Sequence, residues 1–423
     1  MLDIKFIREN PELIREAARK KHLEIDLKAL LVLEEKRRAL LAIVEEKRAE
    51  QNRHTDEIAK TEDKEKRGKM IQEMRGLKEA LKSQEEDLMK TMKAWRALML
   101  HVPNIPDVSV PEGASDLENK EVKTWGTKPD FSFKPKNHVE LMERLGMLDI
   151  PRGIKVAGFR GYFLKGDGAL LAFAIWQFAY KHFLSKGEFI PAIAPSLVKK
   201  EVFLGTGYLP QGEEDLYKTQ NGDYLAGTSE VALMGYHMNE VLSKSELPKK
   251  FLGFSPCFRR EAGSHGKDTK GIFRVHEFYK FEQVVLCEAS HVESVKHHEW
   301  INRNTEEFIE ALEIPYHTVI NCGADLGLGQ VKKYDVELWV PSENTYREIS
   351  SASYFHDFQT RRLNIRYRDD DKTLQYAHSL NSTAIATPRI LVALVENNQQ
   401  EDGSVKVPAA LKPYFGKDTI TLS

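Results

Sequence analysis

The sequence predicts an α+β protein. An N-terminal, long antiparallel α-helical coiled-coil arm is followed by a domain with a mixed, mostly antiparallel β-sheet flanked by helices. Three observations predict this fold class. Residues 1–100 are dense in charge, with very few Gly and no Pro after Pro11. A Pro-rich stretch follows, and beyond it helix-like and strand-like runs alternate without the βαβ regularity of a parallel sheet.

Two apolar stripes define the arm, which we expect at 1–102 with the coiled coil at about 27–99. The first stripe is Leu27, Leu30, Leu33, Leu40 and Val44. The second falls on a 3-4 heptad ladder, interrupted at Lys78 and Glu85, and consists of Ile71, Met74, Leu81, Leu88, Met92, Trp95 and Met99. The polar stretch 61–68 between them predicts the tip. Two helices of about 33 residues would extend roughly 50 Å and should project into solvent.

The charge of the arm leaves two interpretations open. Residues 34–96 contain 17 basic and 15 acidic side chains, a net charge of +2. This balance is typical of a solvated coiled coil or a dimer interface. It also fits an arm that binds nucleic acid through basic spots, because phosphate contacts need only a few well-placed cations. The candidate cations near the tip are Lys64, Lys66, Arg67 and Lys69.

The connector at 103–135 carries repeated Pro, which blocks helix and favours an extended chain. From 136 to 423 we expect the second domain. Residues 168–182 have the pattern of an apolar helix, and 189–195 that of a strand ended by Pro195. The mixed sheet is predicted from strand-like runs at 251–258, 272–286, 316–322 and 334–339.

Composition narrows the function classes. The chain has 423 residues, 30% charged and 41% hydrophobic, as expected of a soluble protein with two or more domains. Its net charge of −2 gives no global basic signature, so nucleic acid would have to bind local patches. No apolar run approaches the roughly 18–20 residues of a membrane span. The N-terminus has no signal-peptide or presequence pattern, so we expect a cytoplasmic protein with no membrane partner.

The cysteines predict neither a disulfide framework nor a structural zinc site. Cys257, Cys287 and Cys322 are odd in number, far apart, and form no C-x-x-C pair. We expect Cys257, beside the most informative segment of the chain, to be a small buried hydrophobic residue.

That segment, from Phe258 to Gln283, has the charge order of a strand, loop and strand that hold a nucleotide. Arg259 and Glu261 stand two apart and would share one face of a strand. The planar fork of Arg suits phosphate, and Gly lets the loop close over a ligand. A buried carboxylate such as Glu282 needs a cationic or hydroxyl partner, which a substrate can supply. From this pattern alone, a surface hairpin with exposed charges stays an alternative.

Other nucleotide motifs are absent from the sequence. There is neither G-x-x-x-x-G-K-[ST] nor a G-x-G-x-x-G after a strand, which argues against a P-loop or Rossmann site. The pattern is consistent with a nucleotide site on an antiparallel sheet.

Read with three further segments, this stretch resembles the seryl-tRNA synthetases, a class II aminoacyl-tRNA synthetase family. The segments are Leu-Ala-Gly-Thr-Ser-Glu at 225–230, YREISSASYFHDFQTRR at 346–362 and LNSTAIATPRILVALVENNQQEDG at 380–403. The likeness runs from MLDIKFIRENPELIR to VPAALKPYFG, in family order, over nearly the whole chain. It implies an enzyme that activates L-serine with ATP and transfers it to the 3′ end of tRNA(Ser), with tRNA(Sec) an open question.

The resemblance also implies partners and a cofactor. It implies Mg²⁺ with ATP and a homodimer built through the helix at 168–182 and the strand at 189–195, and the cysteine pattern disfavours the rarer zinc-dependent type, so we expect no zinc. The resemblance favours the nucleic-acid interpretation of the arm, which would grip the long variable arm of tRNA(Ser). The loop 262–272, with His265, Lys267 and Lys270, is the candidate contact to the acceptor end.

Site residues are implied position by position. The catalytic set is Arg259, Glu282, Glu348 and Arg389, and the Mg²⁺ ligands are Glu348 and Ser351. The ATP set is Arg259, Glu261, Arg274, Val275, Phe278, Glu348, Ile349, Ser350, Ser351 and Arg389. The serine set is Thr228, Glu230, Arg259, Glu282, Asn381 and Thr383. In these sets Phe278 stacks on the base, Glu230 pairs with the α-ammonium, and Glu282 accepts the substrate hydroxyl.

Departures from the family pattern leave the source lineage open between a bacterial and a processed organellar protein. The stretch 381–389 has no glycine before Arg389, Arg260 replaces a small residue, and Ala352 stands where Cys is frequent. Three rival interpretations are weaker. A relative that charges a carrier protein lacks the long arm, and a silent paralogue would have lost residues of the catalytic set. A coiled-coil scaffold would not keep these motifs over 250 residues.

Overall fold

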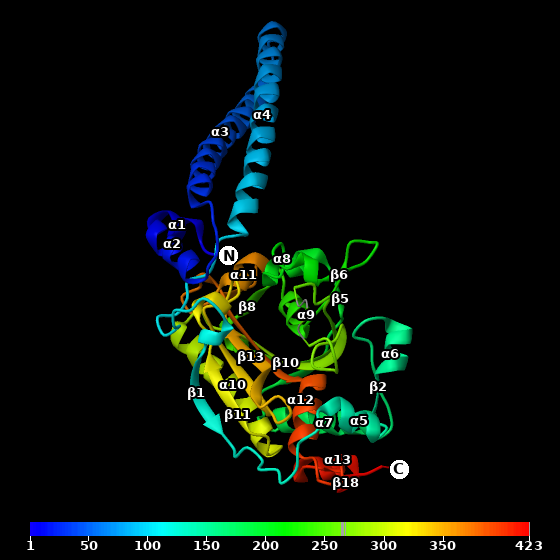
Figure 1. Cartoon of the computed structure of the whole chain (residues 1–423). Helices are drawn as coiled ribbons and strands as arrows, with labels where there is room; N and C mark the ends of the chain where they lie inside the picture. Colours follow the sequence, from blue (N-terminus) through cyan, green and yellow to red (C-terminus); the bar gives the residue numbers. More distant parts are fainter. Residues whose placement is uncertain (264–265, 267, 423) are drawn as a thin grey trace. The chain divides into compact units, whose positions relative to one another are not determined.

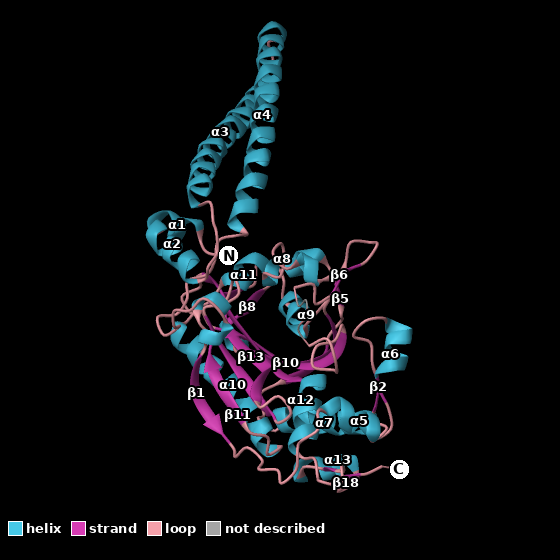
Figure 2. Cartoon of the chain, in the orientation of Figure 1, coloured by secondary structure: helices cyan, strands magenta, loops and turns pink. Residues whose placement is uncertain are grey.

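The computed structural model of the protein describes residues 1–263, 266 and 268–422. These residues divide into two compact units. One unit contains 2–19 and 23–103, and the other contains Met1, 20–22 and the chain from Asn104 onward. Figures 1 and 2 show the order of helices and strands within each unit.

The predicted arm is confirmed as a long helical hairpin. The helices of the N-terminal region are α1 (Ile4–Glu9), α2 (Pro11–Lys20), α3 (Leu27–Lys60) and α4 (Lys64–Met99). Asp26 caps α3 by accepting a hydrogen bond from the Ala29 backbone N–H at 2.9 Å, and Asp63 caps α4. The turn takes only residues 61–63, which is shorter than the predicted tip. The candidate cations 64–69 therefore lie in the first turns of α4.

Along most of α4 the apolar seam of the hairpin uses one of the two ladder positions. The buried residues at a spacing of seven are Met74, Leu81 and Leu88, and the last two pack with Val44 of α3. At the other ladder position Ile71 and Met92 are exposed, contrary to the prediction, whereas Met99 at the base of α4 is buried, as predicted. Lys78 and Glu85 share that second position, so they lie on the exposed flank and do not interrupt the seam.

The second unit is built on a mixed sheet that is antiparallel except at one edge, as predicted. Its strand order is β1-β11-β12-β13-β16-β10-β9-β4, with only β4 parallel to its neighbour. The strands are β1 (Lys120–Trp125), β4 (Ile190–Ile193), β9 (Lys249–Phe258), β10 (Glu277–Cys287), β11 (Tyr316–Ile320), β12 (Lys332–Val340), β13 (Thr345–Tyr354) and β16 (His378–Ala386). The edge strand β1 comes from the predicted connector and pairs with β11.

Helices cover this sheet and supply the main hydrophobic core, which joins side chains of α7 and α12 to the strands. The longer helices are α7 (Asp167–Leu184), α10 (His291–Ala311) and α12 (Thr387–Asn397). Shorter ones are α5 (His138–Arg144), α6 (Ile150–Ala157), α8 (Lys200–Thr206), α9 (Ser229–Tyr236), α11 (Phe358–Leu363) and α13 (Lys412–Phe415). The small sheets are β15-β14-β8, β17-β18, β2-β3 and β5-β7-β6.

Two irregularities of the main sheet bear on the site. The register of β12 against β13 shifts between Val336 and Glu337, and that of β10 against β16 shifts between Phe281 and Glu282. Each shift inserts one extra residue and so changes which side chains share a face. The predicted strand 272–286 begins only at Glu277, because residues 259–276 form the loop between β9 and β10.

Candidate active site

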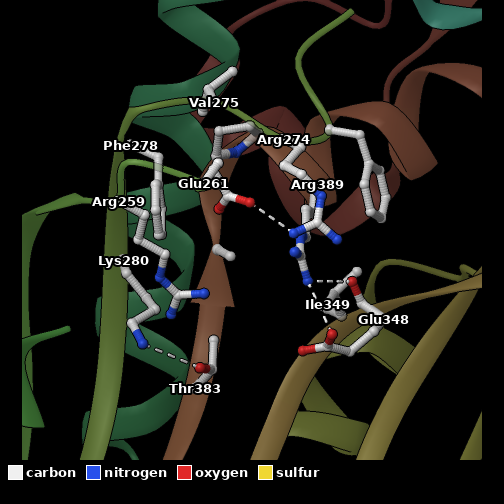
Figure 3. A pocket seen from close by; sticks show the side chains of 13 residues that line it. Arg259, Glu261, Arg274, Val275, Phe278, Lys280, Glu348, Ile349, Thr383 and Arg389 are labelled. Carbon is white, nitrogen blue, oxygen red and sulfur yellow. Dashed lines mark hydrogen bonds and ion pairs between the residues drawn. The ribbon is translucent and has the colours of Figure 1, made fainter. Parts of the chain in front are cut away.

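A pocket on the main sheet brings together distant parts of the sequence (Figure 3). Its lining, which we call the sheet pocket, is Arg259, Glu261, Phe273, Arg274, Val275, Phe278, Lys280, Glu348, Ile349, Thr383, Ala386, Pro388 and Arg389. All of the expected ATP residues except Ser350 and Ser351 are among them. Three of the four expected catalytic residues line it directly, and Glu282 adjoins it through Lys280.

Arg259 follows the end of β9 and is fixed from two sides. Its backbone N–H donates to the His276 carbonyl at 3.0 Å, and its guanidinium carbon lies 5.6 Å from the centre of the Phe278 ring. Its Nη2 donates to the Gly227 carbonyl at 3.4 Å. The segment 225–230 is thereby joined to the pocket.

Glu261 does not share a strand face with Arg259, so that part of the prediction is wrong. The strand ends at Phe258, and Glu261 has a φ of +55°, in the left-handed region. This turn directs its carboxylate to the returning chain, where Oε2 accepts from Arg274 Nη1 at 2.7 Å. Arg259 and Glu261 still both line the pocket, because the turn at Glu261, and not strand alternation, directs its side chain there.

Asp268 joins two arginines beside the pocket. It accepts from Arg274 Nε at 3.4 Å and from Arg347 Nη2 at 2.7 and 2.8 Å. The Arg347 guanidinium stacks 3.9 Å from the Phe273 ring, and that of Arg389 lies 4.9 Å from the same ring. Sequence reasoning missed both Asp268 and Phe273, whose partners are set by the loop.

Glu348 and Arg389 form the far wall of the pocket. Arg389 Nη1 donates to the Glu348 carbonyl at 2.9 Å and lies 3.3 Å from its Oε2. The surrounding protein opposes the charge of Glu348, but Arg389, Lys333 and Arg259 together hold the pKa of its carboxyl below the ordinary value. Glu348 is therefore an ionised carboxylate near neutral pH.

The bulge in β13 explains how Glu348 and Ser351 share a face. Residues three apart on a regular strand point to opposite faces. Here Ser351 pairs with Asp335 and Glu348 pairs with Glu337, so Ile349 is the extra residue. Asp335 and Glu337 alternate regularly on β12, which places their partners on one face. The two expected metal ligands are thus brought to the same side, and their hard oxygen donors fit Mg²⁺.

Ser350 points elsewhere. It is buried, and its hydroxyl donates to the Thr383 carbonyl. Any contact of Ser350 with a nucleotide would have to use its backbone. Asn381 lies two residues before Thr383 on β16, in regular register with β10, and so has its side chain on the same face as Thr383.

Glu282 lies across from Thr383 in the paired strands β10 and β16. Thr383 Oγ1 donates to Glu282 Oε2 at 3.3 Å. Lys280 Nζ is 2.5 Å from the same oxygen and 3.3 Å from Thr383 Oγ1. The cationic and hydroxyl partners that the sequence required for a buried Glu282 are therefore supplied by the protein itself.

Glu230 lies in a separate group of buried contacts, the Glu230 cluster, which consists of Thr228, Glu230, Tyr208 and Gln359. Thr228 caps α9 by accepting from the Glu230 backbone N–H at 3.2 Å. Tyr208 Oη donates to one carboxylate oxygen at 2.9 Å and Gln359 Nε2 to the other at 2.8 Å. Burial, and then the charge of Glu282, raises the pKa of Glu230 to about 7.

Sequence reasoning missed three of these polar residues. Lys280 could have been found, because Phe278, Lys280 and Glu282 alternate along one strand and so share a face. Tyr208 and Gln359 carry no local signal. They meet Glu230 from positions 22 and 129 residues away.

The loop 262–272 is described only in part. His265 and Lys267 lie outside the described residues, and Lys270 lies inside them. Cys257 is fully buried, as predicted, and the three cysteines are free. Within the described ranges, no group of three or more His, Cys, Asp or Glu side chains is arranged to hold a metal ion. No helix of the described chain is long and apolar enough to cross a membrane.

Family models cover both units of the chain. Residues 1–106 match the seryl-tRNA synthetase N-terminal domain, and residues 217–398 match the tRNA synthetase class II core domain (G, H, P, S and T).

Full-length relatives are similar throughout. The serine–tRNA ligase of Deinococcus radiodurans is 46% identical over 417 residues, which is 98% of both chains. The crystal structure of the seryl-tRNA synthetase of Pyrococcus horikoshii, complexed with ATP, superposes with a TM-score of 0.90 at 39% identity and covers 100% of both chains. That of the cytoplasmic serine–tRNA ligase of Naegleria fowleri, in complex with AMP, gives a TM-score of 0.86 at 33% identity. It covers 100% of this chain and 99% of that one.

Proposed function

The chain belongs to the seryl-tRNA synthetase family, and on that premise we propose that it activates L-serine with ATP and then transfers serine to tRNA(Ser). In the first step a carboxylate oxygen of serine attacks the α-phosphorus of ATP, and the bond to pyrophosphate breaks. In the second, a hydroxyl at the 3′ end of the tRNA attacks the seryl carbonyl, and AMP leaves.

The nucleotide occupies the sheet pocket in this proposal. Phe278 stacks on the base, Arg259 contacts the α-phosphate, and Arg389 lies near the γ-phosphate and adenine. Glu261, Arg274 and Val275, together with Ile349 and the backbone of Ser350, complete the nucleotide contacts. Two guanidinium groups in a partly enclosed pocket can stabilise the charge that develops on the phosphates.

Mg²⁺ would be held by Glu348 and Ser351. The β13 bulge places both on one face, and the low pKa of Glu348 keeps its carboxylate ionised. When bound, the ion would neutralise phosphate charge. Arg389, which contacts Glu348, holds that carboxylate in place before any ligand binds.

Serine binds between the Glu230 cluster and the pair Glu282–Thr383. Glu230 pairs with the α-ammonium and Thr228 supports it, while Arg259 contacts the carboxylate. Glu282, Thr383 and Asn381 read the side-chain hydroxyl. A site built to hydrogen-bond a hydroxyl rejects analogues that lack it by about 10⁴-fold in favourable cases, which would exclude alanine and glycine.

A homodimer is the proposed assembly. Apolar side chains are exposed on α7 and on β4, the edge strand of the main sheet, and they are Leu170, Phe173, Tyr180, Ile190 and Ile193. Exposed apolar side chains and an open sheet edge favour association with a second copy.

The arm is proposed to bind tRNA(Ser). Lys64, Lys66, Arg67 and Lys69 are exposed in the first turns of α4. Replacing these four by Gln should raise the KM for tRNA(Ser) and reduce its salt dependence, since phosphate contacts are lost. Serine activation without tRNA should be unchanged. An unchanged KM for tRNA would contradict the role of this cluster.

The observation that carries the proposed function is the full-length similarity together with the convergence of Arg259, Phe278, Glu348 and Arg389 on one pocket. The test is ATP–pyrophosphate exchange without tRNA, with serine, alanine, threonine and cysteine in parallel. Exchange that depends on serine is expected. A folded preparation that gives no exchange with any amino acid would contradict an enzyme.

A further inference from the structure

Glu230 is held by two uncharged donors, one on each carboxylate oxygen, from Tyr208 and Gln359. No Lys, Arg or His of the described residues forms an ion pair with it, and Lys280 is a cation whose charge lowers its pKa, though less than burial and Glu282 raise it. Hydrogen bonds orient a buried carboxylate, but neutral donors leave its charge uncompensated. The protein therefore fixes the direction of Glu230 without supplying the cation that it lacks.

Gln359 is itself fixed by contacts on both of its amide atoms. Its Oε1 accepts from Ser379 Oγ at 2.7 Å, and its Nε2 also donates to the Thr206 carbonyl at 3.1 Å. Both Gln359 and Ser379 are buried. Exchanging the amide oxygen and nitrogen would place the amide oxygen against two acceptors, the Thr206 carbonyl and the Glu230 carboxylate, so the Thr206 carbonyl helps set which end of the amide faces Glu230.

Tyr208 holds the other carboxylate oxygen of Glu230. It lies two residues beyond the end of α8. Burial, and then the charge of Glu230, raises the pKa of its hydroxyl well above the ordinary value, so the phenol stays protonated and can donate. Arg259 and Glu282 also act on this hydroxyl, which places it among the charged groups expected to contact serine.

We propose that Tyr208 and Gln359 are positioning residues that hold Glu230 as an uncompensated carboxylate and thereby set the preference of the site for an α-amino group. The ligand class is an amino acid or aminoacyl adenylate with a free α-ammonium. A lysine in either position would supply the missing cation from within and weaken that preference. The inference rests on the proposed serine site.

A purely structural role makes a different prediction. The same groups join α9 to Tyr208 and to α11, and α11 to the end of α8 and to β16, so they could stabilise packing only. Loss of packing would weaken every ligand of the site alike. Loss of Glu230 positioning would weaken only ligands that carry the α-amino group.

The experiment uses two probes that differ in that group alone. The first is the non-hydrolysable sulfamoyl analogue of seryl-adenylate, and the second is its counterpart without the α-amino group. Calorimetric titration of the full-length protein gives the Kd of the deamino probe divided by the Kd of the amino probe. In Tyr208→Phe and Gln359→Met this ratio should fall about tenfold from the wild-type value, since each loses a hydrogen bond to a charged group. Binding of the deamino probe should stay unchanged.

Tyr224→Phe is the matched control. Tyr224 also donates its hydroxyl to a carboxylate, that of Glu213, outside the Glu230 cluster. Its removal should leave the ratio unchanged. Because Gln359 is buried, Gln359→Met can fail to fold. Tyr208→Phe removes one oxygen from a half-buried ring and decides the matter alone.

The outcomes separate the inference from its premise. An unchanged ratio in a folded Tyr208→Phe variant, or equal weakening of both probes, would overturn the positioning role. A wild-type protein that binds both probes equally would instead show that the proposed role of Glu230 is wrong.

Discussion

The α3–α4 hairpin and the sheet pocket both depend on charged side chains, but they place them in opposite surroundings. In the hairpin, Arg48 and Glu85 pair at 2.6 Å while 60% and 39% exposed. Beside the pocket, Lys280 and Glu282 pair at 2.5 Å while only 5% and 3% exposed. An exposed ion pair contributes about 0–1 kcal/mol, whereas breaking a buried one costs about 3–5 kcal/mol.

The difference shows what the charged side chains contribute in each region. The stability of the hairpin comes from a thin apolar seam. Its surface charges contribute little to stability, so they are available to contact another molecule. In the pocket region the charges themselves determine which side chains can occupy each position. Changes of a single charge should therefore be severe in the pocket and mild in the hairpin.

The largest effect is expected for Arg389→Ala. It removes a guanidinium that we propose contacts the phosphates, so serine-dependent ATP–pyrophosphate exchange should fall about 10³-fold. The control is Arg368→Ala, at an exposed position on β14 (Arg366–Arg368), which should leave exchange unchanged. Equal losses in the two variants would remove the distinction between pocket and surface charges.

Lys280→Met should come next. It leaves Glu282 buried without its cation, and the free energy of unfolding should fall by about 3–5 kcal/mol. Adding Glu282→Gln removes the unpaired buried charge, so the double variant should regain part of the lost stability. The four proteins form a double-mutant cycle. Denaturant unfolding of all four proteins measures the coupling. Additive losses would mean that the buried pair does not act as a unit.

The pH dependence of Glu230 should be smaller and has a defined sign. Burial and Glu282 raise its pKa to about 7 in the folded protein, against about 4.3 in an unfolded chain. The stabilising contribution of its protonated form is fully present below the unfolded value and is lost as pH rises through 7. Glu230→Gln, which stays neutral, should therefore raise Tm relative to wild type at pH 8 but not at pH 4.

The same titration should appear in activity. Below pH 7 the wild-type kcat/KM for serine in exchange should fall by about tenfold per pH unit as Glu230 loses its charge. A flat profile between pH 5 and 8, with no Tm difference for Glu230→Gln, would show that Glu230 stays ionised throughout.

The smallest effects belong to the hairpin. Leu88→Ala removes a seam side chain that packs with Val44 and should lower the stability of α3 and α4 by about 2 kcal/mol. Arg48→Ala, at an exposed pair beside the same seam, should change it by less than about 1 kcal/mol. Amide hydrogen exchange of the two helices measures both changes in stability. ATP–pyrophosphate exchange should be unchanged in both variants. A larger loss in Arg48→Ala would reverse the comparison.

The sequence predicted these two regions unequally, for a physical reason. Helical periodicity is a local signal, so the stripes through Leu81 and Leu88 located the hairpin, although only the structure shows which residues of the ladder are buried. The family resemblance located the pocket residues. It did not reveal the partners of Glu230, because Tyr208 and Gln359 are brought to it by three-dimensional folding across long separations.

Backbone irregularities account for the rest of what was missed. The left-handed φ of Glu261 breaks the two-residue alternation that placed it beside Arg259. The bulge at Ile349 likewise breaks alternation and brings Glu348 to the face of Ser351. Residue identity alone gave no sign of either irregularity.

That bulge makes chain length between Glu348 and Ser351 more important than the side chains in between. A substitution at Ile349 or Ser350 keeps the phase of β13, whereas loss of one residue would restore regular pairing and turn Glu348 to the opposite face. In evolutionary terms, this stretch can vary in composition but not in length. An alignment gap inside it would mark a lineage in which the proposed metal ligands no longer share a face, even if both residues survive.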